Sequence, residues 1–302
     1  MLKLLRRNLA LLPLYAWSLP GFCHGGEHVE SFGWSADWWL IGLLLAATGF
    51  YAAGCLRLRH DGSLGKVLGP LRQLAFWSGM LILILALLSP VDAIADRMFS
   101  VHMVQHLLLM IVAPPLLVWG RPMLVWLWAF PLDRRRSIGR WWNGSRRLRT
   151  TYEFLMRPLS IWLLASVALW LWHIPGMYDW ALDNEFVHGV EHACFFLTSL
   201  AFWTLVTAPY GERQVNHGLA LLSLFTFALH SGILGALLTF ATSPLYRMHG
   251  LPLYSLTPLQ DQQLAGLIMW IPASVIYVGA FAWLFVKWLE HAERTSWKAS
   301  SP

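Results

Sequence analysis

The sequence predicts an all-α membrane protein, a bundle of seven transmembrane helices that follows an N-terminal signal sequence or anchor. Its composition is 57% hydrophobic and only 13% charged over 302 residues, whereas about a quarter of the residues in a soluble domain are charged. The mean hydropathy is +0.52. The 19 tryptophans suit the aromatic belts of the two membrane interfaces. Apolar stretches long enough to cross a bilayer recur along the chain.

The first residues, 1–25, resemble an export signal. A basic start precedes an apolar run over residues 9–19, and small or turn residues follow that run. This order is typical of a signal peptide, and an uncleaved signal anchor is the alternative. No repeat or low-complexity segment divides the remainder, so residues 26–302 are predicted to form one seven-helix integral membrane domain.

Seven apolar stretches are long enough, or nearly so, to form membrane-spanning helices. They lie at about 38–56, 72–90, 99–119, 157–173, 186–208, 217–240 and 262–288. The stretch from Met123 to Phe130 is too short to span a bilayer, and we interpret it as an interfacial or re-entrant segment. The expected architecture is therefore one compact helical bundle.

Basic residues gather in alternate loops, and this pattern predicts the orientation of the spans. The segment 121–157 carries nine arginines, and the loop after the first span and the C-terminal tail are also basic. The opposite loops are mainly acidic. The positive-inside rule therefore predicts cytoplasmic basic loops and C-terminus, and an external N-terminus after signal processing. We interpret the arginines as an orientation signal and a lipid-headgroup contact rather than a nucleic-acid site.

Two histidine pairs are the most informative polar feature of the spans. His102 and His106 lie in the third span, and His188 and His192 lie in the fifth. A spacing of i, i+4 puts both rings of a pair on one helix face, about 6 Å apart along the axis. Both spans enter from outside, so the two pairs fall at one depth in the outer half. Ionisable residues inside a span indicate function, and four converging imidazoles suit a metal ion or a haem.

Further residues are candidates to support this site from the outer half of the membrane. They are His173, Glu191, His230, Asp261, Gln262, Met98 and Met110. Glu191 is a candidate to orient a ligand histidine. Met98 and Met110 extend the first pair by i, i+4 steps, and thioethers suit Cu(I), although a methionine at helical spacing is more often a packing residue.

Other interpretations of the histidines stay open. They can be buried side chains that hydrogen-bond across helices or line a wet cavity. A haem-binding membrane cytochrome or quinone-linked electron carrier would take one axial ligand from each helix. Two haems cannot fit about 6 Å apart, so one histidine of each pair would be left over.

A transporter or proton channel is disfavoured, because the cytoplasmic halves of the spans lack charged residues. The pattern His-x-x-Glu-His at 188–192 also matches the inverted zincin motif, which is weak evidence for a protease.

The three cysteines have no metal-finger or redox spacing. Cys23, Cys55 and Cys194 therefore predict neither a disulfide framework nor a ligand set. Cys23 lies beside His24 and His28 on the expected outer face. A metal-capturing role for that N-terminal group is a separate hypothesis.

Several motifs along the spans occur together in one known family. The longest runs from His102-Met-Val-Gln-His106 through Ala113-Pro-Pro115 to Gly120-Arg-Pro122. The others are Trp172-His-Ile-Pro-Gly176, His188 to His192, and Asp261-Gln-Gln-Leu-Ala-Gly266 leading to Trp270 and Pro272. Together they resemble the CtaG-like caa3-type cytochrome c oxidase assembly factors, the polytopic membrane type. The resemblance covers the chain from about the first span to the seventh.

The resemblance implies a multi-pass protein of the bacterial inner (plasma) membrane that helps cytochrome c oxidase to mature. It implies copper as the metal and an oxidase subunit as the partner, alongside membrane lipids and without nucleic acid. The assignment of His102, His106, His188 and His192 as ligands is an inference from spacing and depth. We expect an assembly function without turnover, so not an enzyme, and a haem-binding cytochrome is the alternative.

Overall fold

The structure is a computed structural model that describes residues 34, 35, 37–207, 217–247 and 256–300. All regular elements in these residues are helices, which confirms the predicted all-α class. In chain order they are α1 (Trp38–His60), α2 (Leu64–Val67), α3 (Pro70–Leu87), α4 (Pro90–Ala95), α5 (Phe99–Leu107), the π-helix η1 (Leu108–Val112), α6 (Ala113–Trp119), α7 (Pro122–Trp128), α8 (Leu132–Gly144), α9 (Arg146–Leu155), α10 (Pro158–Trp172), α11 (Pro175–Asp183), α12 (Glu185–Thr207), α13 (His217–Thr239) and α14 (Pro258–Ser300). The expected signal or anchor, with Cys23, His24 and His28, lies outside the described residues. Cys55 and Cys194 are free thiols.

Six of the predicted spans correspond to helices that are long and apolar enough to cross a membrane. Within the described residues these are α1, α3, the continuous run of α5, η1 and α6, then α12, α13 and α14. The span predicted at 157–173 is α10, which has 15 residues and passes the same test only together with α9, at an angle of 67°. Proline disfavours helical geometry in the residue before it. Arg157, which precedes Pro158, is accordingly extended and separates the two helices.

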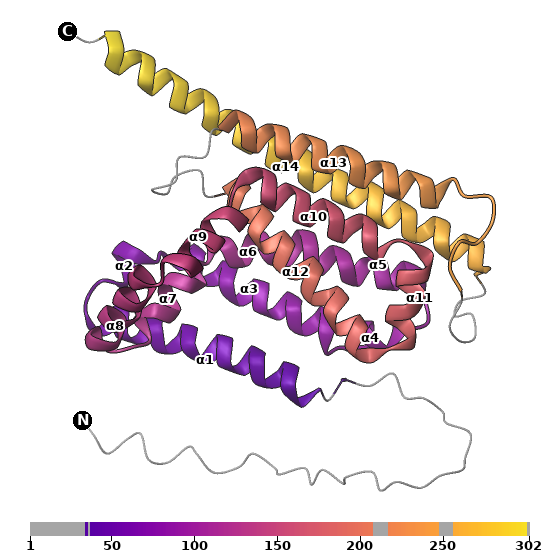
Figure 1. Ribbon diagram of the computed structural model, residues 1–302, viewed down its shortest axis with the longest axis horizontal. Helices are drawn as coiled ribbons and strands as arrows, with labels where there is room; N and C mark the ends of the chain where they lie inside the picture. Colours follow the sequence, from indigo (N-terminus) through magenta and orange to yellow (C-terminus); the bar gives the residue numbers. More distant parts are fainter. Residues whose placement is uncertain (1–33, 36, 208–216, 248–255, 301–302) are drawn as a thin grey trace, which may run out of the picture. The chain divides into compact units, whose positions relative to one another are not determined.

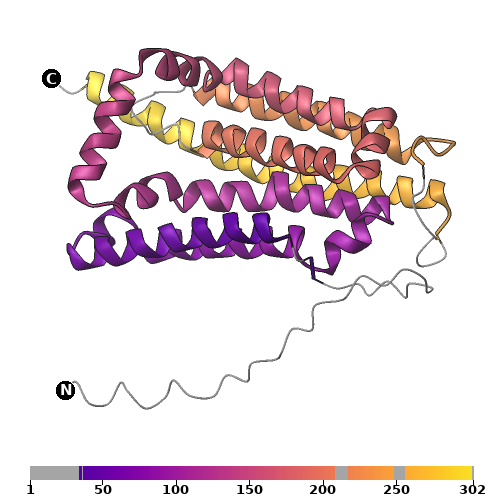
Figure 2. The ribbon, with the colours of Figure 1, turned by 60° about the horizontal axis from the view of Figure 1, so that its bottom comes forward.

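The long helices run side by side (Figure 1, Figure 2) and bury two apolar clusters. The larger cluster lies among α5, α10, α12, α13 and α14, and the smaller lies mainly among α1, α3, α6 and α7. The third span belongs to both, because Leu109 packs in the smaller cluster and Met110 in the larger. This span is therefore shared by the two halves of the bundle, and its N-terminal part carries His102 and His106.

Helices α13 and α14 approach each other through two glycines. A Cβ atom on Gly266 would lie 2.5 Å from Oγ1 of Thr239 and 2.7 Å from the carbonyl oxygen of Gly235. A larger residue would push the helices apart, and small residues permit this close contact between transmembrane helices. The contact fixes the first turns of α14, from which Asp261 reaches the third span.

The segment from Met123 to Phe130, expected to be interfacial or re-entrant, forms most of α7 and the turn that follows it. It packs against α1, where the Trp126 indole donates a hydrogen bond to the Ala47 carbonyl at 2.8 Å. The turn before α7 is tight, since Arg121 adopts the left-handed region at φ 52°. The Gly120-Arg-Pro122 motif is thus the reversal between two packed helices.

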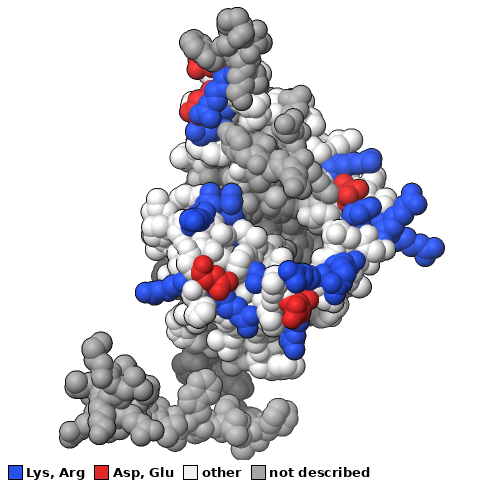
Figure 3. All heavy atoms as spheres, turned by 90° about the vertical axis from the view of Figure 1, so that its left-hand side faces the viewer, with Lys and Arg blue, Asp and Glu red and all other residues white. Residues whose placement is uncertain are grey.

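Basic side chains cover one end of the bundle. Figure 3 views the end at which α2, α7, α8 and α9 lie, and Lys and Arg gather over it. Helices α8 and α9 carry seven of the arginines between 134 and 149 and bury none of their residues. This is the end whose loops are predicted to face the cytoplasm, and the histidine pairs lie toward the opposite end of their spans.

Candidate metal centre

The helix that carries the first histidine pair is capped by a side chain from a distant part of the chain. Asp261 of α14 is buried and accepts hydrogen bonds from the backbone N–H groups of Phe99 at 2.7 Å and Ser100 at 3.1 Å. These are the first two residues of α5, whose N–H groups have no partner inside the helix. A carboxylate is favourable there because it also opposes the positive end of the helix dipole. Asp261 therefore fixes the start and direction of α5.

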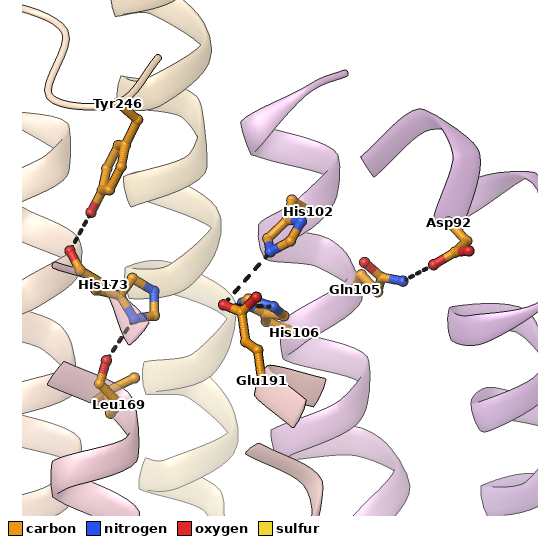
Figure 4. Close-up of polar contacts among 8 residues, drawn as sticks. All are labelled: Asp92, His102, Gln105, His106, Leu169, His173, Glu191 and Tyr246. Atoms are coloured by element: carbon orange, nitrogen blue, oxygen red, sulfur yellow. Dashed lines mark hydrogen bonds and ion pairs between the residues drawn. The ribbon is translucent and has the colours of Figure 1, made fainter. Parts of the chain in front are cut away.

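A second side chain ties α5 to the neighbouring helices. Nε2 of Gln105 donates to the Ala86 carbonyl at 2.8 Å and to Oδ1 of Asp92 at 2.7 Å. Asp92 lies in α4, between two spans. Burial raises the pKa of its carboxyl to about 6, and the hydrogen bond from Gln105 opposes that rise. With Gln105 bound to α3 and α4, the opposite face of α5 is directed toward α12 (Figure 4).

The π-helix η1 directly precedes the two prolines of the span. In an α-helix the carbonyl of Met110 would accept from residue 114, and in a π-turn from residue 115, but both are prolines and have no N–H. The indole of Trp203, on α12, donates to this carbonyl at 2.9 Å. A buried carbonyl without a partner is costly, above all in a membrane. Trp203 therefore supplies the hydrogen bond that the prolines remove.

Replacement of Trp203 by phenylalanine is expected to destabilise the protein by about 1–3 kcal/mol, the cost of leaving a buried carbonyl unpaired. Thermal unfolding of the detergent-solubilised protein measures the effect. Trp162→Phe is the matched control, because the buried indole N–H of Trp162 has no hydrogen-bond partner. Equal midpoints for the two variants would contradict the role assigned to Trp203.

The second histidine pair lies on α12, whose start is capped locally. The Asn184 side chain accepts from the backbone N–H of Val187 at 3.1 Å, as a helix-capping asparagine does. The next turn presents His188, Glu191 and His192, spaced i, i+3 and i+4 and hence on one face. Side chains at these positions meet the histidine-bearing face of α5.

The two pairs come together, as their spacing and depth predicted. The ring centroids of His102 and His188 are 5.4 Å apart, those of His102 and His192 6.1 Å, and those of His106 and His192 5.5 Å. Candidate ligand atoms of His102, His188 and His192 all lie within 4.8 Å of one another. His102 therefore meets both histidines of the facing helix.

Glu191 lies between the two histidines of the opposite helix (Figure 4). Its Oε1 is 4.0 Å from Nε2 of His102 and 3.7 Å from Nε2 of His106. These three residues form a second group whose ligand atoms lie within 4.8 Å of one another. His102 is common to both groups, so the four imidazoles and one carboxylate make one continuous cluster, hereafter the histidine cluster.

The polar atoms of the histidine cluster are buried and have no hydrogen-bond partner. This holds for both ring nitrogens of His102 and His106, for Nε2 of His188 and His192, and for both carboxylate oxygens of Glu191. His102 and Glu191 are 0% and 1% exposed. Buried polar groups without partners are costly. Imidazole nitrogens and a carboxylate are metal-ligand atoms, and a bound cation would satisfy them, so the residues fit a metal ion.

Some of the predicted supporting residues lie near the histidine cluster, and others make contacts elsewhere. His173 is near the cluster, since its ring centroid is 6.3 Å from that of His106. Gln262 instead accepts from the backbone N–H of Leu245 at 2.6 Å and thus holds the segment that follows α13. Met98 lies at the N-cap of α5.

His230 is not part of the histidine cluster. Its Nε2 lies 3.0 Å from Oγ of Ser166, and its Nδ1 accepts from the indole of Trp170 at 3.3 Å. Both partners belong to α10. His230 therefore links α13 to α10, and its partners account for its polarity without a metal.

Three residues that shape the site were not among the sequence candidates. They are Gln105, Trp203 and Tyr178, whose ring packs edge-on against His102 with centroids 5.3 Å apart. The pair Pro114-Pro115 was a usable signal, because two prolines in a span imply a carbonyl that needs an outside donor. No local pattern indicates which tryptophan supplies that donor.

Comparison with known proteins agrees with the motifs. The chain is 27% identical over 273 residues to uncharacterized proteins of Mycobacterium bovis and Mycobacterium tuberculosis, and 24% identical over 271 residues to one of Mycobacterium leprae. Each match covers 85% of this chain but only 40% of the relative. No solved structure matches the chain. The family model of the cytochrome c oxidase caa3 assembly factor (Caa3_CtaG) matches residues 49–291, a region that contains the whole histidine cluster. The chain therefore belongs to the caa3-type cytochrome c oxidase assembly factor family.

Proposed function

We propose that this protein binds copper in the histidine cluster and assists its delivery to a subunit of cytochrome c oxidase. The observation that carries the proposal is the convergence of four imidazoles and one carboxylate, with unpartnered buried atoms, between α5 and α12. Family membership supports the process, oxidase assembly. The relatives are more than twice as long as this chain, so the partner and the delivery step are part of the proposal.

The donor set favours copper over the other metals that imidazole binds. Among divalent first-row ions, nitrogen and oxygen ligands bind Cu²⁺ most tightly. The carboxylate of Glu191 offsets part of the charge of a buried cation, which a neutral ligand set would leave uncompensated. Membership of a family that assembles cytochrome c oxidase is a further reason to propose copper as the ion that is transferred.

The geometry disfavours the haem alternative. A bis-histidine haem needs two imidazoles on opposite faces of a flat macrocycle. His102 and His188 are stacked at 17° with centroids 5.4 Å apart, but His106, His192 and Glu191 crowd around them. A macrocycle between the two rings would have to displace these side chains.

We further propose that the histidine cluster lies near the outer surface of the bacterial inner membrane and exchanges copper on that side. A pocket lined by Asp96, Phe99, Tyr178 and Asp261, among others, lies at the end of the bundle opposite the basic loops. Tyr178 forms part of its lining and packs against His102. The proposed role is to hold and transfer an ion, which needs no turnover, so we propose no enzymatic activity.

Metal analysis of the purified protein tests the proposal. We expect about one copper ion bound per histidine cluster when the detergent-solubilised protein is loaded with copper and freed of excess metal. The reduced-minus-oxidised absorption spectrum should lack the sharp α-band of a bis-histidine haem. A protein that carries stoichiometric haem, or that retains zinc and no copper, would contradict the proposal.

A further inference from the structure

A second group of ligand-type side chains lies on the side of α5 and η1 that faces α10, α13 and α14. A small cavity there, about 20 Å³ in volume, is lined by Met103, His106, Met110, His173 and Met269, together with two hydroxyl-bearing residues, Ser231 and Tyr277, and several aliphatic side chains. His106 also belongs to the histidine cluster through Glu191. The cavity and the cluster therefore share one residue, His106.

The His173 ring is held in one tautomer and presents a free lone pair. Its Nδ1 is 2.6 Å from the carbonyl oxygen of Leu169. A carbonyl only accepts, so Nδ1 carries the proton and Nε2 carries the lone pair. The side chain is 7% exposed, and Nε2 is buried without a hydrogen-bond partner. A histidine whose other nitrogen donates to a backbone carbonyl is oriented as metal-ligating histidines are.

Three thioethers accompany this imidazole. Met103 is 1% exposed, Met110 7% and Met269 9%, and they come from α5, η1 and α14. Buried methionines commonly fill gaps in apolar cores, and packing alone would account for any one of them. Packing does not account for a histidine with an unpartnered ring nitrogen that lines the same cavity as three methionines.

The lack of charged residues in the cavity lining favours an ion of low charge. No Asp, Glu, Lys or Arg belongs to its lining, so every candidate ligand is neutral, in contrast to the histidine cluster with Glu191. The cost of burying a cation in a medium of low dielectric constant rises steeply with its charge. Neutral thioether and imidazole ligands therefore favour a soft monovalent ion, and Cu(I) has this preference.

We propose that the cavity is a second metal subsite, specific for Cu(I), in which Met103, Met110, Met269 and Nε2 of His173 are the candidate ligands. His106 connects it to the histidine cluster, so an ion that stays Cu(I) throughout can move between the two without crossing the lipid. This inference rests on the proposed function only for the identity of the cargo. It assigns the methionines a binding role that the family and the histidine pairs do not supply.

The variant Met103→Leu/Met110→Leu/Met269→Leu tests the subsite, because leucine keeps nearly the volume of methionine but has no sulfur. Cu(I) is titrated into wild type and variant under anaerobic reducing conditions against a competing chelator. We expect the variant to lose the tighter-binding equivalent or to bind it at least tenfold more weakly. Met80→Leu is the matched control, since Met80 is equally buried but packs in the other apolar cluster.

X-ray absorption of Cu(I)-loaded protein gives an independent result that needs no variant. Wild type is expected to contain copper–sulfur scattering, which the triple variant loses and Met80→Leu retains. A wild-type spectrum with nitrogen and oxygen ligands only would overturn the subsite, as would an unchanged Cu(I) affinity in the triple variant. In His102→Ala/His188→Ala the sulfur-ligated Cu(I) is expected to persist. The subsite and the proposed function therefore fail in different measurements.

Discussion

The double variant His102→Ala/His188→Ala is expected to lose the copper ion bound at the histidine cluster and to lower cytochrome c oxidase activity in membranes. His102 belongs to both ligand groups of the cluster, and His188 supplies the facing helix. Their removal leaves neither group with three ligands. Changes at residues that only support a metal site cost 10–100-fold in affinity, so loss of two ligands should cost at least about 100-fold at the histidine cluster. Metal analysis and an oxidase assay, at matched protein level, measure the two effects.

His230→Ala is the control for that experiment. It removes an intramembrane histidine that hydrogen-bonds to α10 and lies outside the cluster. The control should keep wild-type binding at the cluster, although it loses contacts between α13 and α10. Wild-type copper content and affinity in the double variant would refute the ligand assignment, and reduced content in His230→Ala alone would point to a different site.

The second large effect is expected from Asp261→Ala, a change outside the cluster. Two backbone N–H groups at the start of α5 would lose a charged acceptor. Hydrogen bonds to charged groups contribute about 1.5–3 kcal/mol each, and their buried donors would be left unpaired. We expect a loss of about 3 kcal/mol or more in unfolding free energy and weaker copper binding, because α5 positions two of the imidazoles. Thermal unfolding and a copper titration of the solubilised protein test both expectations.

Asp261→Asn separates charge from shape at the same position. The amide keeps one oxygen acceptor of nearly the same geometry but has no negative charge to oppose the helix dipole. The Asn variant should therefore fall between wild type and the Ala variant in stability. An Ala variant with the wild-type midpoint would show that α5 does not depend on this cap.

The sequence could predict the spans and the meeting of the histidine pairs for the same physical reason. Apolar length locates a transmembrane helix, and basic loops indicate its direction. Equal distances from the outer ends then put His102 and His188 at one depth. The prediction of spans was least accurate at residues 157–173. Pro158 and the residue before it produce a bend there, which hydropathy alone does not predict.

The rest of the site depends on which side chains meet across helices, and local patterns do not contain this information. The series Met98, His102, His106 and Met110 assumes an unbroken α-helix, but Met110 lies in a π-helix that directly precedes two prolines. Met110 lines a cavity together with Met269, from a helix some 160 positions later. Asp261 was among the expected supporting residues, and its contact with the start of α5 is visible only in three dimensions.

Helix α12 holds the third span at two places, through the histidine cluster near one end and through the bond from Trp203 to Met110 further along. If α12 slid along the third span by one helical turn, about 5.4 Å, the imidazole pairs would separate. The same movement would break the hydrogen bond from Trp203 to the Met110 carbonyl. The geometry of the histidine cluster and the position of α12 along the third span therefore change together. If the histidine cluster holds copper as proposed, release of the ion is expected to be all-or-none, with intermediate positions of α12 scarcely populated.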